Sequence, residues 1–254
     1  MTAELRLLFH RRQMKYGKIA EAKFIERENR FVARVELPGG EITMVHVKNT
    51  GRCRELLLRG SRVYLEDFAG RMGSRRMRYS LVAVEKETDR GIILINMDSQ
   101  APNRVVQEAL ADGRISLPGL ADLTLIKPEV KYGDSRFDFY VEATGAGGEL
   151  QRFFIEVKGV TLEENGHARF PDAPTERGVK HINELIRARG EGCGACILFV
   201  VQMEGIKDVS PNDETHPQFG EAIARARGAG VTILAYDCLV TPDTLTVNKE
   251  INFI

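Results

Sequence analysis

The sequence has little that would suit a secreted or membrane-spanning protein. Its 254 residues include only four cysteines, which are too few and too unevenly spaced for a disulfide framework. No apolar run approaches the roughly 20 residues that a membrane span needs. The first residues also lack the long apolar centre of a signal peptide. We therefore expect a cytoplasmic protein with reduced thiols and no membrane partner.

The sequence also lacks net charge. Lys and Arg together number 36, as do Asp and Glu, so overall charge cannot drive nucleic-acid binding. Phosphate binding would have to come from local patches. The segment RMGSRRMRYS, residues 71–80, is one such patch, because it carries arginines and a tyrosine but no acid. A plain solvated loop is the alternative interpretation.

Residues 14–96 are predicted to form one domain of short strands. β-branched and aromatic residues recur there between turn residues. One helix is expected at residues 50–60, capped by Thr50 and ended by Gly60. About five strands with a helix between the third and the fourth suggest a small OB-type barrel, a frequent platform for single strands and oligosaccharides. The six candidate strands are residues 18–27, 30–40, 41–49, 61–68, 79–87 and 91–98.

Residues 97–254 are predicted to form a second domain that mixes strands and helices. Its first helix is expected to take Asn103 as its cap. Continuous apolar strands between helices imply an α/β fold with a sheet covered on both faces. The predicted strands are residues 127–133, 135–143, 150–160, 195–203 and 231–238, the last in the chain, and the later helices are residues 172–190 and 217–230.

Three charged residues interrupt two of these apolar strands. Glu156 and Lys158 share one face of their strand because side chains alternate. If the glycine-rich reversal is centred on Gly147, Asp138 lies directly across from Glu156, with Cβ atoms about 5 Å apart. Two carboxylates this close repel each other unless a cation lies between them. Hard oxygen ligands at this spacing suit Mg²⁺ or Mn²⁺.

Lys158 has a chemical use beside such an ion. An ammonium group there can steady an attacking water or the negative charge of a transition state. Asp138, Glu156 and Lys158 therefore suit metal-dependent phosphodiester cleavage. The alternative is that Lys158 only neutralises the two acids in a structural ion pair.

The barrel also contains candidate nucleic-acid contacts. Arginine and an aromatic ring together can grip phosphate and stack on a base. A structural loop remains the alternative here too. The candidates are Asn49, Thr50, Arg52, Arg75, Arg76, Arg78 and Tyr79.

An Asp on one strand and Glu-x-Lys on the next resemble the PD-(D/E)XK nuclease superfamily. The strings NTG, APN, YGDSRFDF, EVKGVTL, FPDAPTERGVKH and LFVVQ resemble, more specifically, the sugar fermentation stimulation protein A family. The resemblance covers nearly the whole chain after about residue 14. It implies an N-terminal OB fold joined to a restriction-endonuclease-like domain, with DNA binding and a role in regulating sugar use.

The resemblance also assigns roles to residues. It places Asp138, Glu156 and Lys158 on the metal and catalytic positions, and Glu108 on the acidic position of the first helix. Superfamily members often approach the active site from the helix of residues 172–190. The further nucleic-acid contacts expected here are Arg136, Arg177, Lys180 and His181.

The sequence therefore predicts a nuclease-like DNA-binding protein that uses Mg²⁺ or Mn²⁺ and has weak sequence preference. Two alternatives stay open. One is a DNA-binding regulator that keeps the metal site but cuts nothing. The other is an RNA-binding or RNA-processing protein.

Overall fold

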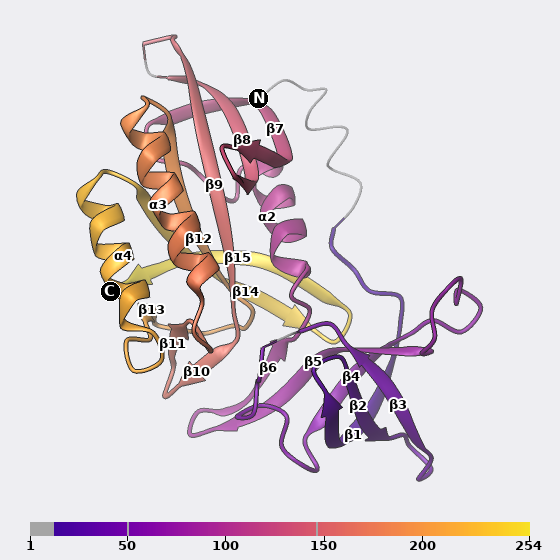
Figure 1. Cartoon of the computed structure of the whole chain (residues 1–254). Helices are drawn as coiled ribbons and strands as arrows, with labels where there is room; N and C mark the ends of the chain where they lie inside the picture. Colours follow the sequence, from indigo (N-terminus) through magenta and orange to yellow (C-terminus); the bar gives the residue numbers. More distant parts are fainter. Residues whose placement is uncertain (1–12, 50, 146) are drawn as a thin grey trace.

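The chain folds into a small barrel and a larger sheet domain, shown in Figure 1. The structure is a computed structural model that describes residues 13–49, 51–145 and 147–254. None of the helices in this part of the chain has the length and apolar character that crossing a membrane requires. Its four cysteines are all free thiols.

The first domain is an OB barrel, as predicted. Its sheet has the strand order β3-β2-β1-β4-β5-β6, and a parallel pairing of β3 with β5 closes the first five strands into a barrel. Alternate strand residues such as Val35, Val45 and Leu65 fill the interior. The strands are β1 (Lys18–Asn29), β2 (Val32–Glu36), β3 (Ile42–Val47), β4 (Arg62–Asp67), β5 (Tyr79–Thr88) and β6 (Gly91–Asn96).

The helix predicted at residues 50–60 is wrong. The described residues 51–60 form bends and turns. Cys53 has a φ of 44°, a left-handed conformation that interrupts a helix. In addition, Arg27 binds the carbonyl oxygens of Asn49, Gly51 and Arg52, which therefore face β1. Thr50, the predicted cap, lies outside the described residues.

The second domain is built on a mixed sheet of nine strands. Its order is β10-β11-β13-β15-β14-β12-β9-β8-β7, with β9, β12 and β14 parallel at its centre. The short strands were not predicted from the sequence, and neither was β15, whose many polar residues hide its alternation. The strands are β7 (Leu120–Tyr132), β8 (Ser135–Gly145), β9 (Leu150–Val160), β10 (Leu162–Glu164), β11 (His167–Phe170), β12 (Gly194–Val201), β13 (Asp208–Pro211), β14 (Thr232–Thr241) and β15 (Thr244–Phe253).

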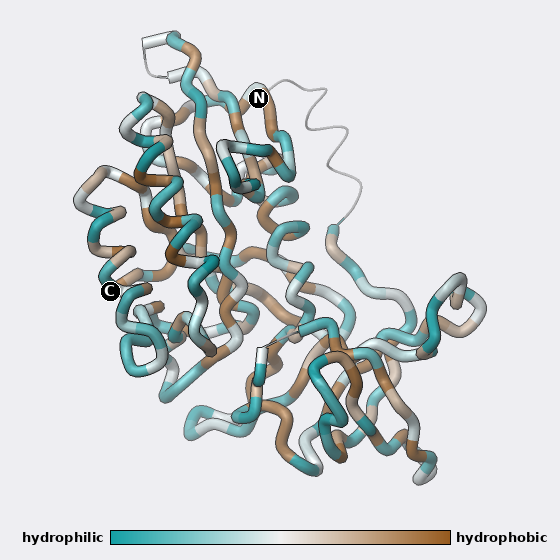
Figure 2. Tube along the Cα trace, viewed as in Figure 1, coloured by the Kyte–Doolittle hydropathy of each residue, from teal (hydrophilic) through white to brown (hydrophobic). Residues whose placement is uncertain are grey.

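Helices cover both faces of this sheet, as predicted. Helix α2 (Ala101–Asp112) packs on one face, and α3 (Glu176–Gly190) with α4 (Pro217–Gly228) on the other (Figure 1). The predicted cap of α2 is wrong, because the helix begins after Gln100. Thr175 caps α3 by accepting a hydrogen bond from the Gly178 amide. Figure 2 shows hydrophobic residues along the central strands and hydrophilic residues in many of the turns.

The two domains share a buried polar junction. Tyr16 donates a hydrogen bond to Asp98, and Asn96 donates one to the Tyr16 hydroxyl. Gln202, which directly follows β12 in the second domain, donates to the side-chain and backbone oxygens of Asn96. Residues 13–16, which precede β1, also bond to the second domain, since the Tyr16 amide donates to the Asp243 carbonyl oxygen. Tyr16, just before β1, is therefore hydrogen-bonded to both domains.

Candidate active site

The β8–β9 hairpin sets the two acids beside each other. Phe139 pairs with Ile155 and Thr144 with Leu150, which is the register predicted for a hairpin centred on Gly147. The ladder between the strands ends at Phe139. Beyond it, Asp138 Oδ2 accepts a hydrogen bond of 2.8 Å from the backbone amide of Val157. Asp138 is therefore held against the Glu156–Lys158 segment by the main chain.

Glu156 carries the most unusual atom of the site. Its side chain is 4% exposed. Its Oε1 lies 2.6 Å from Lys158 Nζ and 2.5 Å from His181 Nδ1. Its Oε2 is buried and has no hydrogen-bond partner among the described residues. A buried carboxylate oxygen is normally satisfied, so this one is free to bind a further group.

The Asp138 carboxylate, on β8, bridges the neighbouring strand β9 and helix α2. Its Oδ1 accepts a hydrogen bond of 2.7 Å from Asn103 Nδ2. Burial, and then the negative charge of Glu156, raise the pKa of Asp138 above its ordinary value, although the Val157 and Asn103 hydrogen bonds oppose this. A cation beside both carboxylates would relieve this repulsion.

The pKa of Glu156 moves the other way. Burial would raise it, but hydrogen bonds from His181 and Lys158 outweigh burial and hold the pKa below its ordinary value. Glu156 is therefore the more readily ionised acid of the pair. Lys158 stays close to the pair with 13% of its side chain exposed.

Asp138 and Glu156 fit a hard divalent cation that keeps water ligands. The Oε2 of Glu156, which has no partner among the described residues, could supply one oxygen ligand, and the Asp138 carboxylate a second. No group of three His, Cys, Asp or Glu side chains in the described ranges is arranged to hold a metal ion. The remaining positions would belong to water and substrate phosphate, as Mg²⁺ prefers.

Glu108, the expected third acid, is not brought into such a cluster. It is half-buried on α2, and its Oε2 accepts a hydrogen bond of 3.0 Å from the Met14 backbone amide. Burial raises its pKa. This hydrogen bond of Glu108 therefore ties Met14, ahead of β1, to α2.

Helix α3 supplies a residue whose role the sequence did not reveal. His181 was expected to face nucleic acid, but its side chain is 7% exposed and contacts Glu156. Arg177 Nε donates to His181 Nε2 at 3.3 Å, so Nδ1 is left to donate to the carboxylate. Glu184, three residues further along the same helix, is also buried. Arg177 and Lys180 do lie exposed.

The barrel candidates divide into exposed and structural groups. Arg52 and Arg76 are exposed, whereas Asn49 is half-buried and accepts from the Gly51 amide. Arg75 packs over Phe68, 3.7 Å from the ring centroid. The other candidate, Thr50, falls outside the described residues.

Tyr79 cannot present its ring to a base as predicted. It is 7% exposed and packs in the barrel core. Arg78 lies over its ring and binds both oxygens of Asp67 at 2.7 Å. In the second domain, Arg136 is exposed and forms a 3.3 Å ion pair with Glu129. Arg78 and Arg136 are therefore already paired with acids.

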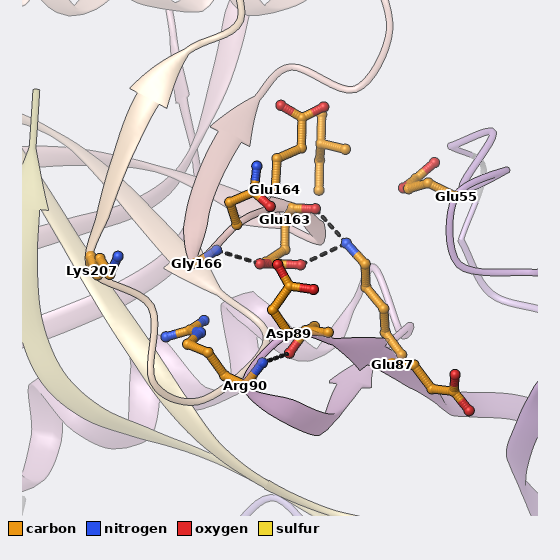
Figure 3. Close-up of a pocket in the computed structure, with 12 residues that line it drawn as sticks. Glu55, Glu87, Asp89, Arg90, Glu163, Glu164, Gly166 and Lys207 are labelled. Carbon is orange, nitrogen blue, oxygen red and sulfur yellow. Dashed lines mark hydrogen bonds and ion pairs between the residues drawn. The ribbon is translucent and has the colours of Figure 1, made fainter.

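A pocket of about 620 Å³ lies at the domain junction (Figure 3), and an ion pair that connects the two domains lines it. Glu163 lies there between two donors, the Gly166 amide at 2.5 Å and Lys86 Nζ at 2.6 Å. Lys86 comes from the barrel and Glu163 from β10. This ion pair joins the two domains.

The fold and the acid pair together define an OB barrel joined to a nuclease-like sheet domain. Residues 25–95 match the model of the SfsA N-terminal OB domain, and residues 100–244 match that of the sugar fermentation stimulation protein RE domain. The chain therefore belongs to the sugar fermentation stimulation protein family, and the resemblance seen in its motifs is confirmed.

Individual relatives agree with this assignment. A sugar fermentation stimulation protein homolog of Clostridium beijerinckii is 48% identical over 241 residues, which cover 95% of this chain and 100% of the relative. One from Desulfitobacterium hafniense is 48% identical and covers 91% of this chain and 94% of its own. The structure of Pyrococcus furiosus SfsA in complex with Ca²⁺ matches with a TM-score of 0.80 and 27% identity, covering 95% of this chain and 98% of that chain.

Proposed function

We propose that the protein is a cytoplasmic DNA-binding nuclease that hydrolyses phosphodiester bonds with Mg²⁺ or Mn²⁺ held by Asp138 and Glu156. The observation that carries the proposal is the buried Oε2 of Glu156, which has no partner in the described chain and lies in a site with a second carboxylate. The Pyrococcus furiosus relative was solved in complex with Ca²⁺, another cation that prefers oxygen ligands. The family name, sugar fermentation stimulation protein, supports a proposed role in the regulation of sugar metabolism.

The side chains have separate tasks in this proposal. A divalent ion would polarise a phosphoryl oxygen and supply hydroxide near neutral pH. Asp138 and Glu156 would supply the oxygen ligands for the ion, and the Val157 amide, Asn103 and His181 keep the two carboxylates in place. Lys158 lies 2.6 Å from Glu156 and offers its ammonium to the negative charge that develops on phosphate.

One observation favours a second candidate, a DNA-binding regulator that cuts nothing. Lys158 already forms a close ion pair with Glu156, and that pair alone neutralises one buried acid. A lysine engaged in this way stabilises the hairpin without any reaction. An RNA substrate is the third candidate, since RNA carries the same phosphodiester group.

A substrate panel tests these candidates. Purified protein is incubated with end-labelled single-stranded and duplex DNA and RNA of one sequence, with Mg²⁺, Mn²⁺ or EDTA. The nuclease proposal predicts metal-dependent shortening of DNA that is lost in Asp138→Asn. Intact DNA in the presence of bound metal would favour the regulator, and cleavage confined to RNA would favour the third candidate.

A further inference from the structure

A groove of about 790 Å³ runs along the barrel next to the second domain. The end of β1 and the turn after it form one side, and the segment between β3 and β4 forms another. Ala173 and Pro174, which lead into α3, come from the second domain. Five arginines line the groove, namely Arg27, Arg30, Arg52, Arg54 and Arg59.

Arg27 shapes this groove. Its guanidinium donates to backbone carbonyl oxygens on both sides, including those of Asn49 at 2.6 Å, Gly51 at 2.6 Å and Arg30 at 2.7 Å. A guanidinium has five N–H donors, and Arg27 directs all its described hydrogen bonds to the main chain. Arg27 therefore holds the turn after β1 and the segment after β3 together, and the other four arginines are the ones available to a ligand.

Those other four arginines form no direct ion pair with an acid among the described residues, although the charge of Arg52 acts on the Asp172 carboxylate and helps to lower its pKa against the effect of burial. Arg30, Arg52, Arg54 and Arg59 are exposed, and within the described ranges none of their guanidinium groups forms an ion pair. Glu26 is the one acidic residue in the groove lining, and it is paired with Arg34. A concave surface with several unpaired guanidinium groups attracts a chain of phosphates.

We propose that this arginine groove binds the phosphate backbone of a single nucleic-acid strand and leads it toward the acid site. The inference rests on the proposed function, because it takes a nucleic acid as the ligand. Pro174, at one end of the groove lining, directly precedes Thr175, the cap of α3. That helix carries exposed Arg177 and Lys180 and the Glu156-bound His181.

The groove surroundings favour a single strand over a duplex. Phe31, directly after Arg30, exposes 52% of its surface, and Leu58, next to Arg59, exposes 58%. Bases are free to stack on an aromatic or apolar side chain only when they are unpaired. A duplex would leave these apolar side chains without a partner.

The test measures binding without cleavage. Labelled single-stranded DNA, single-stranded RNA and duplex DNA of one sequence are titrated in EDTA against wild type and the variant Arg52→Gln/Arg54→Gln/Arg59→Gln. The matched control is Lys127→Gln/Arg225→Gln/Lys249→Gln, which removes three exposed cations elsewhere. Circular dichroism verifies that both variants are folded.

We expect the groove variant to bind single strands about tenfold or more weakly, with a salt slope smaller by about 2, because each lost phosphate contact contributes about 0.7. The control should bind as wild type does. Equally weakened binding of single-stranded DNA and RNA identifies the shared phosphate backbone as the ligand. Weakened binding of only DNA or only RNA identifies that nucleic acid as the ligand.

Unchanged single-strand binding in the groove variant, or a loss confined to duplex, overturns the inference. Both results are independent of cleavage. Wild type that cleaves DNA while the groove variant binds normally would refute the groove alone. Groove-dependent binding without cleavage under any metal would refute the nuclease proposal alone.

Discussion

Asn103, in the first turn of α2, donates a 2.7 Å hydrogen bond to Asp138 on β8, 35 residues further along the chain. This contact joins a helix on one face of the sheet to the first acid of the site. It also orients the carboxylate, whose other oxygen is held by the Val157 amide.

Asn103→Ala should therefore weaken metal binding. Residues that orient a metal ligand typically contribute about 10- to 100-fold in affinity. We expect a loss of that size for Mn²⁺ in calorimetric titration. Asn183→Ala, which removes an exposed asparagine of α3, is the control. Equal affinity in the two variants would show that Asn103 does not position Asp138.

His181→Ala should have a similar effect through Glu156. Without the Nδ1 donor, Glu156 keeps only Lys158 as a side-chain partner. We expect Mn²⁺ affinity to fall by about 10- to 100-fold. His167→Ala is the control, because His167 is partly exposed and contacts Asp208 instead. An unaltered titration of His181→Ala would contradict this role.

Lys86→Met should destabilise the domain junction. It leaves the Glu163 carboxylate, 1% exposed, without its ammonium partner. Removing one member of a buried pair costs about 3–5 kcal/mol, and partial exposure of Lys86 places the expected loss near the lower end. Urea unfolding measures it. Lys207→Met is the control, since Lys207 lines the same pocket but has no ion pair in the described chain. Equal stabilities for the two variants would exclude a junction role for the pair.

Glu163 also predicts a pH dependence. Burial would raise its pKa, but the Lys86 and Gly166 hydrogen bonds outweigh burial and lower it. Because the folded-state pKa lies below the unfolded value, the stabilisation is present above pH 4.5, the ordinary value, and is lost as pH falls through the folded-state pKa. Glu163→Gln should flatten the acid limb of stability against pH. An acid limb as steep as that of wild type would contradict the assignment.

Local pattern was enough to predict most of the fold. All six barrel strands and the β8–β9 hairpin follow alternation and turn residues, and the register about Gly147 follows from symmetry alone. The predicted helix at 50–60 failed because a distant residue, Arg27, binds the carbonyl oxygens of that segment. A helix propensity cannot anticipate a competitor more than 20 residues away.

The charged residues of the candidate site could be predicted from the sequence, but the residues that hydrogen-bond to its two acids could not. Asp138, Glu156 and Lys158 stand out because charges interrupt apolar strands. Asn103 and His181 do not, since each resembles an ordinary polar residue of a helix until the helices pack on the sheet. Their functional signal is a tertiary contact, which a single sequence does not contain.

The most direct test of the nuclease proposal compares wild type with Lys158→Met in Mn²⁺, measuring DNA cleavage and melting temperature on the same preparations. If Lys158 stabilises charge in the reaction, the variant stays folded, binds Mn²⁺, and cleaves slower by on the order of 100-fold or more. If Lys158 is a structural counter-ion, the variant loses about 3–5 kcal/mol of stability instead. A well-folded variant that cleaves as fast as wild type, or a wild type that cleaves no nucleic acid, would contradict the proposal.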